Sequence, residues 1–289
     1  DTVDIVPITC DLASFASVRR AAAMVQTIAA ERGGLDVLCC NGGVIGQPDK
    51  RTEDGYDVQM QTNYLSHALL SSLLMPSLEA AAEKRGEARI VMHSSGQRNN
   101  GGKLKSANLE RCPEGTLGGN GISGRMGRYA QSKLAQTIFS LELSHRLHAE
   151  SSKVKSISCE PGLVQTNLGS NMFATNPDCC FRCVVGGIFN QIFKGMGVGD
   201  GCGPLIHACF ALETRNGDLC MPRDWLGRFD GVTPVKPIDA GIEKIVKRTE
   251  GKDEHLTMDV ESRAMLWEKT REAIAPCETA ARHDYCVVM

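Results

Sequence analysis

Short apolar runs of strand length alternate along the chain with longer segments that have helical periodicity. Each run ends in turn-prone residues, and apolar positions recur at helical spacing between the runs. The expected strands are residues 3–8, 35–40, 88–94 and 155–160, and the expected helices are 15–31, 59–84 and 129–150. Alternation of strand and helix predicts an α/β fold with a parallel, doubly wound sheet, in which ligands bind at the carboxyl ends of the strands.

The C-terminal half continues this pattern less regularly. A last strand is expected at 217–222, and a closing amphipathic helix is expected at 257–274, ended by Pro276. We therefore expect a single domain over 1–275 and a tail over 276–289. The segment 168–212, before the last strand, is irregular and rich in Gly, Cys and Phe.

One tyrosine–lysine pair is the main candidate for chemistry. Tyr129 and Lys133 lie four residues apart in Tyr-Ala-Gln-Ser-Lys, and of the four tyrosines only this one has a lysine at that spacing. On a helix the spacing places phenol and ammonium on one face, where the positive charge favours the phenolate and lowers the pKa of the tyrosine. The serine pair Ser94-Ser95 ends the apolar run at 89–93. This combination indicates an acid/base centre built on tyrosine.

Further motifs keep a fixed order along the chain. They are Asp11-Leu12, Cys40-Asn41-Gly42-Gly43, Asn63 in Gln-Thr-Asn-Tyr-Leu-Ser-His, and Glu160-Pro161-Gly162-Leu-Val164-Gln-Thr166. In this order and at these distances the motifs resemble the short-chain dehydrogenase/reductase family over nearly the whole chain. The helix text at 129–147 and Met265-Leu-Trp267 resemble its retinol dehydrogenase-like branch. The resemblance implies a Rossmann-like fold.

The resemblance also implies a catalytic role for four residues. Tyr129 would pass a proton to or from the substrate oxygen, and Lys133 would lower the pKa of Tyr129 and hold the nicotinamide ribose. Ser95 would hydrogen-bond the substrate oxygen, with Ser94 as the alternative. Asn63 would anchor a water that links Lys133 to solvent.

The implied cofactor is NADP or NAD, with NADP preferred. Asp11 would accept a hydrogen bond from the adenine amino group, Asn41 would brace the sheet, and the turn after 155–160 would line the nicotinamide. The full set of implied contacts is Asp11, Leu12, Asn41, Gly42, Gly43, Tyr129, Lys133, Pro161, Gly162, Val164 and Thr166.

The implied activity is interconversion of an alcohol with an aldehyde or ketone on a lipophilic substrate, such as a retinoid, a steroid or a fatty aldehyde. The alternatives are a protochlorophyllide reductase-like enzyme and a non-catalytic relative that acts as a binding module. Retention of all four implied catalytic residues favours an enzyme, because a binding module has no chemical need for them. In this family the segment 168–212 would be the substrate lid; the alternative is a helical hairpin packed on the sheet.

The largest departure from the family lies before residue 1, where its first strand, glycine-rich phosphate turn, first helix and second strand have no counterpart. Those parts hold the pyrophosphate at a helix N-terminus. The chain is therefore expected to be an N-terminally truncated member, and residues 1–289 alone are expected not to bind NADH or NADPH in calorimetry. Residues 119–124 spell G-x-G-x-x-G but follow no expected strand, so they are not predicted to bind phosphate.

Three local departures also bear on the site. Cys40-Asn41-Gly42-Gly43 replaces the family's Asn-Asn-Ala-Gly as a tolerated variant. Glu160 stands where the branch often has histidine, which predicts a carboxylate near the cofactor pocket. The thirty-three residues between Ser95 and Tyr129 predict an inserted surface loop beside the site. His67 and His93 are interpreted as structural and left out of the site.

Composition narrows the class of protein further. The 289 residues are 42% hydrophobic with a net charge of −2, which gives no electrostatic reason to expect a nucleic acid partner. The thirteen cysteines are scattered through predicted strands and helices, which indicates a reducing compartment. The cluster at 179–183 matches no standard zinc spacing, so no metal site is predicted.

The last four residues, Cys286-Val-Val-Met, form a C-a-a-X box that predicts farnesylation of Cys286. One prenyl chain gives reversible membrane binding, and Cys277 is a candidate for a second, palmitoyl anchor. The expected location is the cytoplasm, at a cytoplasmic membrane face. The expected partners are a lipophilic small-molecule substrate, that membrane surface and a second copy in a homodimer.

Overall fold

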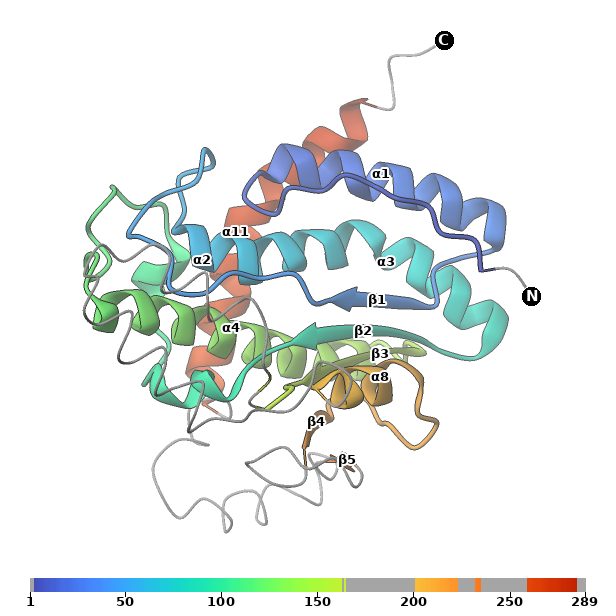
Figure 1. The fold of residues 1–289 in the computed structure, drawn as a ribbon. Helices are drawn as coiled ribbons and strands as arrows, with labels where there is room; N and C mark the ends of the chain where they lie inside the picture. Colours follow the sequence, from blue (N-terminus) through green and yellow to red (C-terminus); the bar gives the residue numbers. More distant parts are fainter. Residues whose placement is uncertain (1–2, 163, 165–200, 223–231, 235–258, 285–289) are drawn as a thin grey trace.

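A five-stranded sheet forms the centre of the computed structural model, which describes residues 3–162, 164, 201–222, 232–234 and 259–284 (Figure 1). Its strands are β1 (Val37–Cys40), β2 (Ala88–His93), β3 (Val154–Cys159), β4 (Leu219–Pro222) and β5 (Val232–Pro234), in the spatial order β1-β2-β3-β4-β5. The first four strands are parallel and β5 is antiparallel to β4. The parallel arrangement confirms the predicted architecture and brings the carboxyl ends of β1 to β4 to one edge of the sheet.

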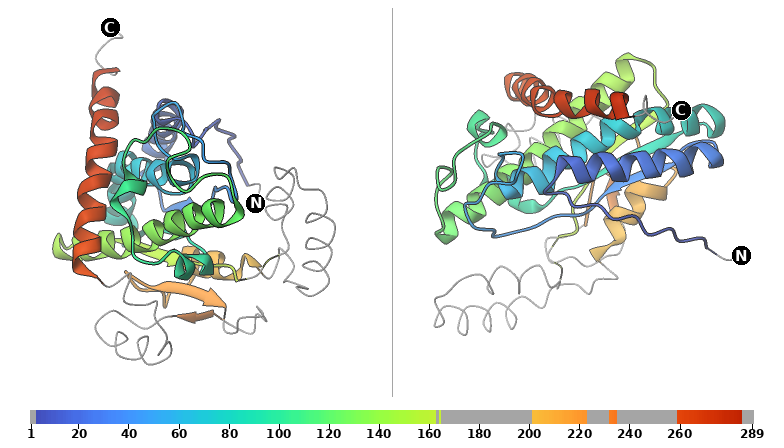
Figure 2. Two further views of the ribbon diagram at one scale, coloured as in Figure 1. Left: turned by 90° about the vertical axis from the view of Figure 1, so that its left-hand side faces the viewer. Right: turned by 90° about the horizontal axis from the view of Figure 1, so that it is seen from above.

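Helices cover both faces of the sheet, most of them on one side (Figures 1 and 2). That side carries α1 (Phe15–Arg32), α2 (Val58–Met60), the π-helix η1 (Gln61–Leu65), α3 (Ser66–Arg85), α4 (Ile122–Ala149) and α11 (Val260–Asp284). Helix α8 (Gly203–Phe210) covers the other face, and the short 3-10 helices η2 (Gly96–Asn100) and η3 (Ser106–Leu109) follow β2.

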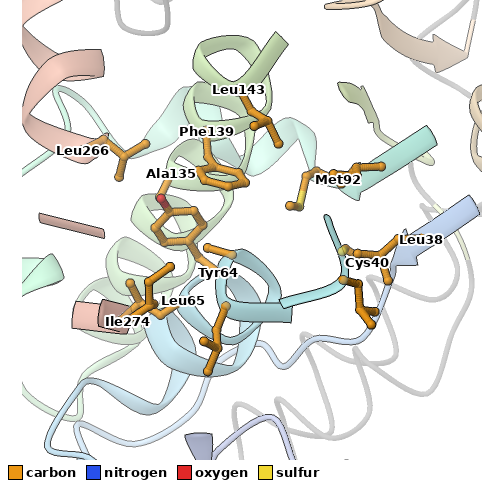
Figure 3. Close-up of a cluster of buried hydrophobic side chains, with 14 of the residues drawn as sticks. Leu38, Cys40, Tyr64, Leu65, Met92, Ala135, Phe139, Leu143, Leu266 and Ile274 are labelled. Atoms are coloured by element: carbon orange, nitrogen blue, oxygen red, sulfur yellow. The ribbon is translucent and has the colours of Figure 1, made fainter. Parts of the chain in front are cut away.

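Side chains along β2 alternate between the two faces of the sheet, so the hydrophobic core consists of two clusters, one on each face. Ile90 and Met92 pack with residues of α3, α4 and α11, whereas Val91 packs with Ile157 and with α8. Figure 3 shows the larger cluster, in which the rings of Tyr64 and Phe139 form a T-shaped pair at a centroid distance of 5.6 Å. Burial on both faces is typical of a parallel sheet.

Two helix boundaries differ from the prediction. Helix α4 begins at Ile122 rather than at residue 129, because its first turns contain no apolar stripe and are held by the buried Arg128 instead. Helix α11 continues through Pro276 to Asp284, so the predicted break is wrong. Proline removes one backbone donor, and here the helix tolerates the loss as α3 does at Pro76.

The predicted strand at residues 3–8 is also wrong. These residues form no regular secondary structure and pair with none of the described strands, and a strand in a parallel sheet requires such a neighbour. Val3 and Ile5 are accordingly 84% and 82% exposed.

Several predictions fall outside the described residues. These are Thr166, the lid up to residue 200, the cysteines at 179–183, the side chain of Cys277, and Cys286. None of the helices in the described ranges is long and apolar enough to span a bilayer. Nor do the described residues contain a group of three or more His, Cys, Asp or Glu side chains arranged to hold a metal ion.

Candidate active site

The carboxyl-terminal edge of the sheet gathers most of the predicted site. Residues 41–43 follow β1, Ser94 and Ser95 follow β2, and residues 160–162 follow β3. Helix α4 packs against β2 and β3 and contributes Tyr129 and Lys133. These residues lie far apart in the sequence, and the parallel sheet brings them together.

The Lys133 ammonium is buried at this edge. Its Nζ donates hydrogen bonds to the carbonyl oxygen of His93 at 2.9 Å and to Gln136 Oε1 at 2.9 Å. Burial lowers the pKa of Lys133 to about 8, because desolvation disfavours the charged form. The residue is thus held beside the end of β2 and loses its proton more readily than an exposed lysine.

Tyr129 is 5% exposed and lies beside Lys133, whose Nζ is 5.8 Å from the centre of the phenol ring. Burial raises the pKa of Tyr129 above its ordinary value, and a hydrogen bond with the Ser95 side chain opposes that rise. The expected lowering of this pKa by Lys133 is therefore not found. The ammonium bonds to His93 and Gln136 instead, and desolvation of the phenolate dominates.

The two serines have different environments. Ser94 is buried, and its hydroxyl donates to the carbonyl oxygen of Lys133 at 2.9 Å and accepts from Thr137 Oγ1 at 2.8 Å. Ser95 is half-buried, contacts Tyr129 and accepts a 3.3 Å hydrogen bond from the amide of Gln97. Ser95 therefore lies beside the phenol of Tyr129, whereas Ser94 packs α4 against the end of β2.

Asn63 lies in the π-helix η1 and is fully buried. Its Nδ2 donates to Val44 O and to Ser132 Oγ, both at 2.9 Å, and its Oδ1 accepts from the Val44 amide at 2.7 Å. The side chain thus ties the loop after β1 to α4, next to Lys133. A π-helix often marks a functional position, and the apolar pattern of the sequence contained no sign of it.

The glycines after β1 allow the backbone to pack closely against neighbouring side chains. A Cβ atom at Gly42 would lie 2.9 Å from Leu12 Cδ1, and one at Gly43 would lie 3.0 Å from Asn63 Oδ1 and 3.5 Å from Lys133 Nζ. Both glycines are exposed. An exposed backbone beside a lysine ammonium fits the ribose of a nicotinamide cofactor.

The other predicted cofactor contacts line the same edge. Asn41 Oδ1 forms a hydrogen bond with His93 Nδ1, which links the ends of β1 and β2 as expected for a bracing residue. Asp11 is exposed, and its Oδ1 accepts a 2.9 Å hydrogen bond from the amide of Ala13. Pro161 and Gly162 follow β3, with Gly162 at a φ of 74° that favours glycine.

His67 is structural, as predicted. It is 3% exposed, and its Nε2 lies 2.8 Å from the carbonyl oxygen of Gly42. Burial lowers its pKa to about 4, so the ring is neutral at pH 7 and donates from Nε2 to that carbonyl. Burial, together with the charge of Lys133, likewise lowers the pKa of His93 to about 4.

The glycine-rich segment at 119–124 and the residues just before it bind the buried carboxylate of Asp49. The amides of Gly115, Leu117 and Gly119 donate to Asp49 at 3.2, 3.1 and 2.7 Å. Asp49 also pairs with the buried Arg128 at 3.6 Å. Of these three amides, that of Gly119 belongs to the motif at 119–124, and it already binds an internal anion. The segment belongs to the expected insertion between Ser95 and Tyr129.

A buried ion pair at this edge was not foreseen. Arg98 Nη1 pairs with Glu160 Oε2, and both side chains are 9% exposed. The sequence indicated a carboxylate at Glu160 but no partner for it. Sixty-two residues separate the two, so spacing offered no signal for their contact.

Comparison with known proteins identifies the fold and the family. Residues 1–107 match the family model described as short chain dehydrogenase. Polyprenol dehydrogenase from Homo sapiens is 33% identical over 164 residues, covering 57% of this chain and 46% of the relative. Retinol dehydrogenase 14 from Mus musculus is 36% identical over 162 residues, covering 56% and 43%. The chain belongs to the short-chain dehydrogenase/reductase family.

The relatives also confirm the retinol dehydrogenase-like branch of the short-chain dehydrogenases that the helix text indicated. Among solved structures, an uncharacterized protein from Mycobacterium Paratuberculosis has a TM-score of 0.58 at 24% identity, covering 91% of this chain and 73% of that chain, which supports the Rossmann-like fold. The chain spans less than half the length of these two dehydrogenase relatives.

Proposed function

We propose that this chain carries the proton-transfer and substrate-binding residues of an NAD(P)-dependent oxidoreductase that interconverts an alcohol with an aldehyde or ketone. The observation that carries the proposal is the convergence of Tyr129, Ser95 and Lys133 at the carboxyl-terminal edge of the sheet. Family membership supports it.

A nicotinamide cofactor, when bound, would supply hydride transfer to or from the substrate carbon. Tyr129 exchanges a proton with the substrate oxygen, as its phenol donates in reduction and its phenolate accepts in oxidation. Ser95 donates a second hydrogen bond to the same oxygen. Lys133 neutralises charge that develops on Tyr129, and Asn63 holds the loop of Gly43 against it and anchors the water that connects Lys133 to solvent.

For the substrate we propose a lipophilic alcohol of the retinoid or polyprenol type, with steroids and fatty aldehydes as the next classes to test. The names of the two dehydrogenase relatives support this choice. For the cofactor we propose NADP, held at the ribose by Lys133 and by the backbone of Gly42 and Gly43. The ratio of kcat/KM for NADPH and NADH tests the cofactor choice.

The test of the activity is turnover by the full-length protein with retinol, polyprenol, steroid and fatty alcohol panels. Tyr129→Phe should reduce kcat by roughly two to four orders of magnitude, since it removes a positioned acid/base. Tyr64→Phe is the matched control, because that phenol bonds Thr270 at 2.5 Å in the core instead. Near wild-type turnover by Tyr129→Phe on every active substrate would overturn the assignment.

We also propose a peripheral membrane attachment through a farnesyl group on Cys286, in keeping with a substrate that partitions into lipid. Mass spectrometry of protein from a eukaryotic host should find the modified cysteine, and Cys286→Ser should move the protein to the soluble fraction. An unmodified tail with unchanged fractionation would rule the anchor out.

A further inference from the structure

The buried ion pair of Arg98 and Glu160 joins two segments that flank the active site. Arg98 lies in η2, the 3-10 helix that begins directly after Ser95. Glu160 is the first residue after β3 and precedes Pro161 and Gly162. The pair therefore connects the segment that carries Ser95 to the segment that is proposed to line the nicotinamide.

Arg98 also bonds directly to Ser95. Its Nη1 donates to the carbonyl oxygen of Ser95 at 3.1 Å, and its backbone amide donates to the same oxygen at 3.0 Å. Glu160 is anchored in turn, because its amide donates to the carbonyl oxygen of Cys220 in β4 at 2.9 Å. A continuous chain of contacts thus runs from Ser95 through Arg98 and Glu160 to the interior strands.

Burial makes this pair different from the surface ion pairs of the molecule. Exposed pairs such as Lys153 with Glu83 are 49% and 71% exposed and contribute little. A buried pair carries a large desolvation cost, so apolar residues of similar volume often stabilise a fold equally well. What apolar residues cannot supply is the directed hydrogen bonding of a guanidinium fork to a carboxylate and a carbonyl.

We propose that Arg98 and Glu160 are positioning residues that hold Ser95 in the orientation in which its hydroxyl meets Tyr129 and the substrate oxygen. This inference rests on the proposed function of Ser95. Neither side chain touches the reacting atoms. The pair acts through the Ser95 backbone, whose placement decides where the hydroxyl points.

The decisive variant replaces both charges at once. Arg98→Met combined with Glu160→Leu leaves no buried charge unpaired, so the fold should keep its unfolding free energy. With the directional link gone, kcat in the full-length protein should fall by roughly ten- to a hundredfold, the effect of a small misplacement in an active site. Substrate and cofactor KM values should change less than kcat. Lys153→Met with Glu83→Leu is the matched surface control.

A second readout does not depend on activity. Amide hydrogen exchange should lose protection at Gln97 and Arg98, which donate to Ser95, while β2 keeps its protection.

The outcomes separate the two proposals. Loss of exchange protection at 97–98 without any wild-type turnover would show that the ion pair holds the Ser95 backbone but would overturn the proposed activity, and with it the role of that contact in catalysis. Wild-type turnover that the apolar double variant retains in full, with unchanged protection, would overturn the positioning role and leave the activity standing.

Discussion

The hydroxyl of Ser94 donates a 2.9 Å hydrogen bond to the main-chain carbonyl of Lys133, so the first serine of the pair docks α4 onto the end of β2. Thr137 reinforces the contact by donating to Ser94 at 2.8 Å. Ser95 is left to contact Tyr129. Alanine substitutions of the two serines should therefore have different effects, one on activity and the other on stability.

Ser95→Ala should lower kcat by about one to three orders of magnitude with little loss of stability, because it removes a donor to the substrate oxygen. Ser94→Ala should instead lower the unfolding free energy by about 1–3 kcal/mol, since Thr137 and the Lys133 carbonyl lose a buried partner. Steady-state kinetics and urea unfolding of both variants check the pair. If Ser94→Ala lowered kcat and Ser95→Ala lowered the unfolding free energy, Ser94 would be the serine that binds the substrate oxygen.

The neutral, buried His67 should make the fold sensitive to acid. Its pKa is about 4 in the folded chain, against an ordinary value of 6.5. The unfolded state therefore binds the extra proton between these values, and stability that is present above pH 6.5 is lost as the pH falls to 4. The loss attributable to this group is roughly 3 kcal/mol.

His67→Gln should flatten the stability curve between pH 4 and 6.5, since glutamine keeps a donor for the Gly42 carbonyl and does not titrate. His148→Gln, at an exposed position of α4, controls for the loss of one histidine. Urea unfolding across this range measures the difference. An equal acid slope in wild type and His67→Gln would contradict the neutral buried ring.

Lys133 should make stability rise with pH in the same direction as His67, but in the alkaline range. Its pKa is about 8 in the folded chain, against an ordinary 10.5. The buried charge therefore costs stability below pH 8, and that cost, roughly 3 kcal/mol, is relieved as the pH rises towards 10.5.

The difference in unfolding free energy between wild type and Lys133→Met isolates this contribution. It should grow in favour of the wild type from pH 8 to 10.5, although the lost hydrogen bonds to His93 and Gln136 add a constant offset. Lys153→Met, at the surface, should show no such trend. A difference that does not vary with pH would mean that Lys133 keeps its ordinary pKa.

Asp49 should contribute strongly to the stability of the inserted loop. Its side chain is 3% exposed, accepts from three backbone amides and pairs with Arg128. Asp49→Asn should lower the unfolding free energy by about 2–4 kcal/mol, because it removes a buried charge from Arg128 and replaces an acceptor by a donor. Asp36→Asn, in a pair where the aspartate side chain is 61% exposed, should cost under about 1 kcal/mol. Equal losses for the two variants would show that the loop does not depend on Asp49.

Comparison of prediction and structure separates local from long-range information. The strands β1, β2 and β3 and the helix α1 were predicted within a few residues, and the expected helix at 59–84 covers α2, η1 and α3 together, because hydrophobic periodicity depends on neighbouring positions in the sequence. The start of α4 was missed since Arg128 is held by Asp49 and Asp57, which lie in a distant segment. The strand at 3–8 failed for a related reason, because pairing requires a neighbour that periodicity does not reveal.

The sequence by itself determined the alternating α/β order and the pairing of Tyr129 with Lys133, which follow from periodicity and spacing along the chain, and its motifs carried the family resemblance that pointed to Asn63 and Ser95. Only the tertiary structure decided the use of each serine, the contact of Arg98 with Glu160, the filling of the glycine-rich segment by Asp49 and the direction of the Tyr129 pKa shift. The physical reason is that the partners in these contacts come from segments about forty to seventy residues apart, and that desolvation outweighs the local charge of a lysine one turn away.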